Sequence, residues 1–320
     1  MIAIMGEQHE NKMKTLLAAS LFLFHGLIQA AGLIVETPCD RALARFDYPA
    51  ATQEAETVLK AHPAEPAAWI CLARARYEQG DFKSALIALD EAAKGAPRHA
   101  LAVRLGNWYG VTLRRLGRLD ESWTKQQQAL RLAQHIQDQA GLATALHNTA
   151  GMRYDRGDAF GALRDYQASI PINPDLAERS ASYNNMGLIH LDMGNARQAR
   201  KSIDAAIVLN RANKHFHHLG KHLINLGNLE RTLGNYAEAK RLLDEGYSLI
   251  EQAGDVFWLG VAAHYRAWLA LDRKQPEMAR VHYGEAAYLY GEVGAAGDLE
   301  RLKREMHSLW PNFVANELPK

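Results

Sequence analysis

The chain has 320 residues, of which 48% are hydrophobic and 23% charged, and this balance is that of a folded globular protein. A formal net charge of +1 gives no reason to expect nucleic acid or another polyanion as a partner. The sequence contains no phosphate-binding loop and no nucleophile elbow, so we expect neither an enzyme nor a bound cofactor.

The N-terminal end has the pattern of a secretory signal peptide. Lys12 and Lys14 precede the apolar run 16–24, and small residues follow from Ala30. The apolar run is too short to be a comfortable membrane span. We therefore predict a signal peptide over residues 1–30, no stable membrane span after its removal, and a periplasmic or secreted mature protein.

From about residue 40 onward, the sequence repeats a pattern of two amphipathic helices separated by a break. In the clearest copy, residues 182–210, apolar residues recur at helical spacing on both sides of Gly194. Gly194 suits the left-handed conformation that ends a helix, and Asn195 suits the cap of the next helix. Equivalent breaks, 37 or 40 residues apart, occur at Gly80, Gly117, Gly157, Gly194, Gly234 and, in degenerate form, Lys274.

Small residues stand at fixed distances from each break. A Gly or Ala lies seven residues before the break, and an Ala or Ser lies five residues after it. Two helices approach closely only where their side chains are small, so this spacing predicts where the helices of each hairpin cross. A single hairpin cannot bury both of its apolar stripes, and we therefore expect the hairpins to stack on one another.

These landmarks resemble the tetratricopeptide repeat. The copy over 69–97 carries that family's residues in order, namely Trp69, Leu72, Ala73, Tyr77, Gly80, Ala85 and Pro97. The resemblance covers about residues 40–293 and implies an all-α, right-handed solenoid superhelix of about six to seven helical hairpins. The repeats exceed the usual 34 residues by about one or two helical turns, which predicts longer helices and not longer loops.

The C-terminal end predicts a closing helix. Residues 298–309 place Leu299, Leu302, Met306 and Leu309 on one stripe and charged residues on the other face, as the open end of a solenoid requires. The predicted organisation is a signal peptide (1–30), an N-terminal half-repeat (31–65), a repeat array (66–294), and a capping helix with a tail (295–320).

Asparagines recur in register on the first helices of the predicted hairpins. Asn148, Asn185 and Asn225 stand two residues before the small packing residue, and Asn107 and Asn184 stand one place earlier. A side-chain amide both donates and accepts, so it can hold the backbone of an extended peptide. The resemblance implies this use in a concave groove, because related arrays grip peptides through such asparagines. The alternative is that asparagine merely tolerates a solvated face.

Further polar and aromatic residues are expected on the same face. Asn228, Arg114, Arg231 and Tyr154 complete the predicted peptide-binding set, because arginine suits carboxylates and tyrosine gives flat contacts. The same face is expected to carry Arg74, Tyr77, Arg115, His147 and Lys221. Aspartates interleave with these residues, so the predicted groove is mixed in charge.

The two cysteines, Cys39 and Cys71, lie in repeat register on the first helices of adjacent hairpins. Such helices pack side by side, so a disulfide between them is possible, and an exported protein permits it. Two buried free thiols fit the sequence equally well.

A histidine-rich segment opens another first helix. His218 and His222 are four residues apart, with His215 one turn earlier, and two imidazoles at that spacing can bind one metal ion. The segment lacks the glutamate of a hydrolytic zinc motif and offers no third ligand beyond His215. We therefore favour a polar helix start and expect no metal.

The sequence as a whole predicts a non-enzymatic protein–protein interaction scaffold of the cell envelope, which binds a peptide or protein segment in its groove. Two alternatives stay open. One is an assembly factor for an envelope or secretion complex, and the other is a signal-sensing regulatory module. The sequence specifies neither the partner nor the oligomeric state.

Overall fold

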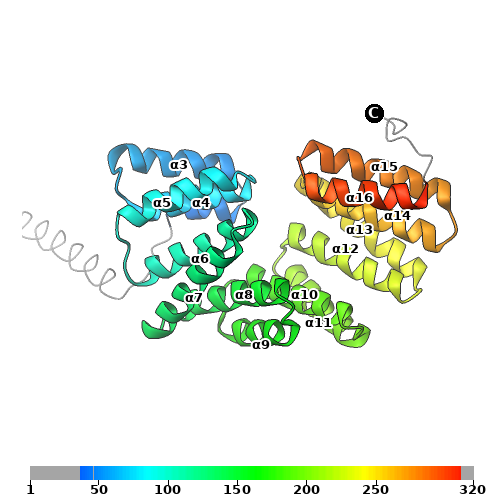
Figure 1. Cartoon of the computed structure of the whole chain (residues 1–320), viewed down its shortest axis with the longest axis horizontal. Helices are drawn as coiled ribbons and strands as arrows, with labels where there is room; N and C mark the ends of the chain where they lie inside the picture. Colours follow the sequence, from blue (N-terminus) through cyan, green and yellow to red (C-terminus); the bar gives the residue numbers. More distant parts are fainter. Residues whose placement is uncertain (1–36, 46, 311–320) are drawn as a thin grey trace, which may run out of the picture. The chain divides into compact units, whose positions relative to one another are not determined.

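The computed structural model describes residues 37–45 and 47–310, which form α-helices, one short 3-10 helix and no strand (Figure 1). The predicted signal peptide lies outside these residues, as does the tail that follows residue 310. In chain order the elements are α2 (Pro38–Ala44), α3 (Tyr48–Ala61), α4 (Pro66–Glu78), α5 (Phe82–Lys94), α6 (His99–Arg115), α7 (Leu119–His135), α8 (Gln139–Asp155), α9 (Ala159–Ser169), η1 (Ile170–Ile172), α10 (Leu176–Asp192), α11 (Ala196–Ala212), α12 (Phe216–Thr232), α13 (Tyr236–Ala253), α14 (Val256–Asp272), α15 (Pro276–Glu292) and α16 (Ala296–Leu309).

The helices divide between two compact units, Met1–Asn148 (unit 1) and Thr149–Lys320 (unit 2), with the boundary inside α8. Consecutive helices pack as hairpins, for example α4 with α5 in unit 1 and α12 with α13 in unit 2. The first helices of neighbouring hairpins also touch, α4 with α6 in unit 1, and α10 with α12 and α12 with α14 in unit 2. We call the surface formed by these first helices and α8 the first-helix surface of each unit.

The predicted breaks are the turns inside the hairpins. Their glycines all have φ between 75° and 83°, the left-handed region that glycine adopts without steric cost: Gly80, Gly117, Gly157, Gly194 and Gly234. In the degenerate copy, Lys274 adopts the same conformation with φ of 59°, which costs roughly 1 kcal/mol for a residue with a Cβ. The repeat of 37 or 40 residues in the sequence therefore corresponds to a left-handed backbone conformation that recurs at the same spacing.

The residue after each break occupies the cap position of the second helix, but only some of these residues make a capping hydrogen bond. Asp81 and Asp158 accept hydrogen bonds from the backbone N–H groups of Ser84 and Gly161. Asn195 occupies the cap position of α11 as predicted, but its side chain makes no capping hydrogen bond. The predicted cap position of Asn195 is therefore confirmed, but the side-chain capping hydrogen bond is not formed.

The small residues lie where the two helices of a hairpin cross. A Cβ on Gly187 would meet Ile203 Cγ1 at 2.5 Å, and one on Gly227 would meet Leu243 Cγ at 2.8 Å. The extra length of the repeats lies in the helices, as predicted, because α6, α7, α10, α11 and α12 each span 17 residues. Longer helices present a longer first-helix surface.

Aliphatic and aromatic side chains between the helices form the cores of both units. Leu43, Ile70 and Leu89 are buried in unit 1, and Leu223 and Tyr283 are buried in unit 2. Within residues 37–45 and 47–310, no helix combines the length and the apolar character needed to cross a bilayer.

The predicted closing helix is α16, which packs on α15 through buried Leu302 and Met306. Between them, Glu305 accepts a hydrogen bond from the Tyr283 hydroxyl at 2.6 Å and another from the Trp268 indole N–H, and it pairs with His264 Nε2 at 2.8 Å. One carboxylate of α16 therefore binds side chains of both α14 and α15.

Candidate functional site

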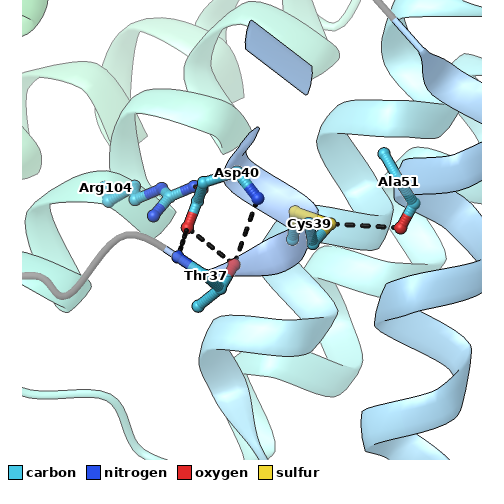
Figure 2. Close-up of a disulfide and its surroundings, with 6 residues drawn as sticks. Thr37, Cys39, Asp40, Ala51 and Arg104 are labelled. Atoms are coloured by element: carbon cyan, nitrogen blue, oxygen red, sulfur yellow. Dashed lines mark hydrogen bonds and ion pairs between the residues drawn. A yellow bond between two sulfur atoms is a disulfide. The ribbon is translucent and has the colours of Figure 1, made fainter. Parts of the chain in front are cut away.

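A disulfide joins Cys39 to Cys71 and so links α2 to α4 at the start of unit 1 (Figure 2). Beside it, the Asp40 carboxylate pairs with Arg104 of α6 and accepts hydrogen bonds from the Thr37 backbone N–H and hydroxyl. Burial alone would raise the pKa of Asp40, but the Arg104 charge and these hydrogen bonds hold that pKa below its ordinary value. The short helix α2 is thus held by one covalent bond and one ion pair.

The first-helix surface of unit 1 carries a cluster of arginine and aromatic side chains. Arg74 lies over the Trp108 ring, 5.6 Å from its centroid, and the Tyr77 and Trp108 rings form an edge-type pair with centroids 5.5 Å apart. Arg115 Nε donates a hydrogen bond of 3.2 Å to the Tyr77 hydroxyl, and its guanidinium carbon lies 5.9 Å from the Phe82 ring. We call these five residues the arginine–aromatic cluster; they join α4 to α6 and the first turn of α5.

Neither arginine of this cluster has a carboxylate within ion-pair distance in the described part of the chain. The Nε of Arg74 is buried and has no hydrogen-bond partner there. Arg115 is exposed, and its bond to Tyr77 engages one of its five N–H groups. The cluster therefore holds two guanidinium groups on ring faces without neutralising either one.

The predicted asparagine ladder contributes to bonds between helices. Asn225 Nδ2 of α12 donates to Asn184 Oδ1 of α10 at 3.0 Å, and both residues are buried. In unit 1, Asn107 is also buried; its Nδ2 donates to the Gly141 carbonyl at 3.3 Å and its Oδ1 accepts from Gln126 Nε2 at 2.7 Å. These three amides tie first helices to their neighbours.

The remaining asparagines of the set are half-buried. Asn185 Nδ2 donates to the Tyr166 hydroxyl of α9 at 3.0 Å. Asn228 Oδ1 accepts from Arg231 Nε at 2.9 Å, and its Nδ2 has no acceptor among the described residues. Asn148 lies in α8 at the end of unit 1. Asn148, Asn185 and Asn228 are thus the amides that reach the surface.

A second bond repeats in register at the C-terminal ends of the first helices. The residue three places before a break bonds the residue two places before the next break. In unit 2, Tyr154 donates to the Asp192 carboxylate, and Arg231 pairs with Asp272 at 2.6 Å. Burial and the Asp192 carboxylate raise the pKa of Tyr154 to about 12, so its hydroxyl stays protonated. In unit 1, the equivalent bond is that of Arg115 to Tyr77.

The polar ends of Tyr154 and Arg231, two predicted peptide-binding residues, are therefore engaged with neighbouring helices. Arg231 also lies over the Trp268 ring, 5.2 Å from its centroid. Arg114, the third predicted residue at this position, is exposed in α6.

The histidine-rich segment forms the start of α12. The rings of His218 and His222 are 6.5 Å apart, and those of His215 and His218 are 6.4 Å apart. Burial, together with the Lys221 charge, lowers the pKa of His218 to about 4 and that of His222 to about 3. Both rings are therefore neutral at pH 7. Among the described residues, no three His, Cys, Asp or Glu side chains are placed to share a metal ion.

Next to this histidine-rich segment, Asp255 caps the start of α14 and binds two side chains of α12. Its carboxylate pairs with His217 Nε2 at 2.7 Å and Lys221 Nζ at 3.1 Å, and it accepts a capping bond from the Trp258 backbone N–H. Lys221 Nζ lies 5.6 Å from the centroid of the Trp258 ring. Burial opposes ionisation of Asp255, but His217 and Lys221 hold its pKa well below the ordinary value.

Two aromatic residues of these surfaces, Trp108 and Tyr265, were not predicted from the sequence, although Tyr77 and Tyr154 were. Trp108 and Tyr265 stand two residues before the small packing residue of their repeats, the position at which other repeats carry Asn148, Asn185 and Asn225. Tyr265 stacks on Trp268 with ring centroids 5.2 Å apart. Comparing all residue types at that position, and not amides alone, would have found both.

Comparisons with known proteins agree with this repeat architecture. Models of the tetratricopeptide repeat match residues 42–106 and 178–252, and a model of anaphase-promoting complex subunit 5 matches residues 110–156. No curated protein sequence matches the chain.

Solved structures show the same fold at low sequence identity. A STAND-type signal transduction ATPase with a tetratricopeptide repeat sensor from Pyrococcus horikoshii has a TM-score of 0.64 at 16% identity, over 87% of this chain and 46% of that one. The Rap conjugation gene regulator of plasmid pLS20, in complex with the Phr* peptide, has a TM-score of 0.63 at 16% identity, over 82% and 74%. A Rap protein complexed with Competence and Sporulation Factor has a TM-score of 0.61 at 13% identity, over 81% and 78%. This chain thus spans about half the length of the ATPase.

Proposed function

We propose that this chain, which belongs to the tetratricopeptide repeat family, is a non-enzymatic scaffold that holds a peptide or protein segment on its first-helix surface. Proteins of this family generally serve as non-catalytic interaction modules. The repeat sets polar and aromatic side chains at a fixed period along that surface. An extended segment offers backbone and side-chain groups at a fixed period too, so such a surface suits an extended ligand.

The observation that carries the proposal is the shared fold with two Rap proteins solved in complexes, one of them with a peptide. The pLS20 regulator is named with the Phr* peptide, and the other Rap protein with Competence and Sporulation Factor. Each aligns with more than four-fifths of this chain. At identities of 16% and 13%, these two structures share the fold of this chain, and experiment must identify its ligand.

Three half-buried amides are the proposed backbone contacts: Asn148 on the first-helix surface of unit 1, and Asn185 and Asn228 on that of unit 2. Each amide can donate to a peptide carbonyl and accept from a peptide N–H, without selecting a sequence. The buried Asn107, Asn184 and Asn225 are proposed to support the surface, since their amides bond neighbouring helices. Tyr154, Arg114 and Arg231 are proposed to border the ligand.

The proposal places the scaffold in the cell envelope, in the periplasm or outside the cell. The disulfide between Cys39 and Cys71 supports this location, because disulfides persist in oxidising compartments. The basic and apolar pattern over residues 12–31 supports it independently. Fractionation tests the location: recovery of the protein in the reducing cytoplasm with free thiols would contradict it.

Chemical crosslinking followed by pull-down tests the binding surface. The variant Asn148→Ala/Asn185→Ala/Asn228→Ala removes three surface amides from first helices. The matched control, Gln128→Ala/Gln198→Ala/Gln252→Ala, removes three exposed amides from the second helices α7, α11 and α13. We expect a crosslinked partner to be lost only from the first variant.

The melting temperatures of both variants, followed by circular dichroism, control for folding. A partner retained by the first variant and lost from the control would refute the first-helix surface. That result would favour an assembly factor that works through its second helices.

A further inference from the structure

The arginine–aromatic cluster of unit 1 has the composition of a carboxylate site, and nothing in the described part of the chain fills it. Arg74 and Arg115 each place a guanidinium group against an aromatic ring, at 5.6 Å from Trp108 and 5.9 Å from Phe82. Cation–π contacts of this kind orient a guanidinium but leave its charge and its in-plane N–H donors to bind an anion. Arginine forks bind carboxylates with two parallel hydrogen bonds.

The missing partner of Arg74 supports a ligand at this site. The residue is half-buried, its Nε has no hydrogen-bond acceptor among the described residues, and no carboxylate there pairs with its guanidinium group. A bound carboxylate would supply that partner. Most other first-helix cations described above already have acidic partners. Arg104 pairs with Asp40, Lys221 with Asp255 and Arg231 with Asp272.

We propose that the arginine–aromatic cluster binds the side-chain carboxylates of an acidic segment in a protein or peptide partner. This inference rests on the proposed function, because it names the chemistry of a ligand on the first-helix surface. The residues that carry it are Arg74 and Arg115, with Trp108, Tyr77 and Phe82 contacting the apolar parts of the segment.

The geometry sets the spacing of the two acidic residues. Arg74 lies beside Trp108, and Arg115 follows Trp108 by two turns of α6, or about 10 Å along the helix axis. In the polyproline II conformation, which has three residues per turn, residues three apart lie on the same face and about 9 Å apart, close to this distance. The preferred segment therefore carries two acidic side chains three residues apart, with small or apolar residues between them.

Fluorescence anisotropy with three labelled peptides of equal length tests this inference. The first peptide carries two glutamates three residues apart and has both ends blocked. The second replaces both glutamates by glutamine, and the third is the glutamine peptide with a free C-terminal carboxylate. We expect the glutamate peptide to bind at least about tenfold more tightly than either of the others. Its affinity should fall as salt is raised, because salt screens charge attraction at an exposed site.

The protein variants assign the binding to the cluster. Arg74→Gln/Arg115→Gln should weaken binding of the glutamate peptide about tenfold or more. Arg74→Lys/Arg115→Lys keeps both charges but loses the planar forks, and should fall between that variant and the wild type. The matched control Arg131→Gln/Arg164→Gln removes two exposed arginines from the second helices α7 and α9 and should bind within twofold of wild type. Circular dichroism melting shows whether each variant is folded.

Three outcomes would overturn the inference. They are equal binding of the glutamate and glutamine peptides, binding of only the peptide with the free C-terminus, and wild-type binding by Arg74→Gln/Arg115→Gln. If the glutamine peptide bound and lost affinity with Asn148→Ala/Asn185→Ala/Asn228→Ala alone, the proposed function would stand and the carboxylate site would fall. Absence of binding by every peptide would also overturn the carboxylate site, while the crosslinking experiment tests the scaffold separately.

Discussion

At equivalent repeat positions, the first-helix surfaces of the two units carry different residues that make different bonds. Two residues before the break, unit 2 carries Asp192 and Asp272, and each carboxylate binds a side chain of the preceding first helix. Unit 1 carries Arg115 at that position, and it donates to the Tyr77 hydroxyl. An aspartate partner neutralises the charge of an arginine. A phenol hydroxyl only accepts one hydrogen bond, so the arginine keeps its net positive charge.

Charges that brace the repeats and charges that bind a ligand differ in whether a carboxylate of the protein pairs with them. In unit 2, Lys221 and Arg231 contact aromatic rings and also pair with carboxylates of α14, so they join first helices. In unit 1, Arg74 and Arg115 contact rings without a carboxylate in the described residues. We therefore expect charge-removing variants of Lys221 and Arg231 to lower stability, and those of Arg74 and Arg115 to weaken ligand binding.

The two units also differ in what holds their terminal helices. Removing the disulfide at the start of unit 1 has the largest expected effect on stability. The disulfide of unit 1 joins residues 32 positions apart. For a loop of that size, the chain-entropy relation gives a loss of about 3–4 kcal/mol when the bond is removed. We expect Cys39→Ala/Cys71→Ala to lower hydrogen-exchange protection in α2–α5 by that free energy and to leave α12–α15 unchanged.

A reductant provides the control for the disulfide. It should destabilise the wild type and have no effect on the double variant. Equal protection of α2–α5 in the wild type and the variant would show that packing alone holds α2 in place.

The end of unit 2 depends on a carboxylate instead of a covalent bond. Glu305→Ala leaves Tyr283, Trp268 and His264 without their common partner, and we expect a loss of about 2–3 kcal/mol in unit 2. Exchange protection should fall in α14–α16 and stay constant in α4 and α5. Glu305→Gln keeps an acceptor of the same shape and should cost less. A Glu305→Ala variant as stable as the wild type would show that Leu302 and Met306 suffice to hold α16.

Acid should destabilise unit 2 through the start of α12. The pKa values of about 4 for His218 and about 3 for His222 lie below the value of 6.5 for an unfolded chain. Between these values the unfolded state binds more protons than the folded state, so the free energy of unfolding falls as the pH falls. From pH 7 to pH 5, each histidine should contribute a loss of about 2 kcal/mol.

The variant His222→Leu isolates one of these contributions. It keeps a buried side chain but removes the titrating group, so its loss between pH 7 and pH 5 should be about 2 kcal/mol smaller than that of the wild type. Urea denaturation at the two pH values measures the difference. An identical pH dependence in the variant and the wild type would show that the pKa of His222 is not lowered in the folded state.

Local backbone rules made the fold predictable from the sequence. Gly80, Gly117 and Gly194 mark turns because a positive φ strongly favours glycine, whatever surrounds it. The small residues at Gly187 and Gly227 mark helix crossings because a Cβ would collide there. Period, hairpin number and helix length all follow from these two local signals.

The candidate site was only partly predictable, because a shift of one residue changes the neighbour that a side chain meets. Asn184 and Asn185 are adjacent in sequence, yet Asn184 bonds α12 and Asn185 bonds α9. Repeat register placed both on first helices but did not predict which amides bond inside the protein. The pairing of Arg231 depends on the next first helix, and the missing carboxylate partner of Arg115 depends on the preceding one, each some 40 residues away, so composition alone predicts neither.

The smallest expected effect distinguishes the two arginines most directly. Arg231 is 16% exposed and its partner Asp272 is 35% exposed, so Arg231→Gln should cost about 1 kcal/mol by leaving the carboxylate without its ion pair. Arg115 is exposed and bonds only a neutral hydroxyl, so Arg115→Gln should change stability by less than about 0.5 kcal/mol. Urea denaturation measures both. A double-mutant cycle of Arg231→Gln, Asp272→Asn and the double variant isolates the coupling, expected at about 0.5–1 kcal/mol. If Arg115→Gln cost as much as Arg231→Gln, the bond to Tyr77 would be a brace between α4 and α6. Arg115 would then belong with the bracing charges of unit 2, and the distinction between the two surfaces would be lost.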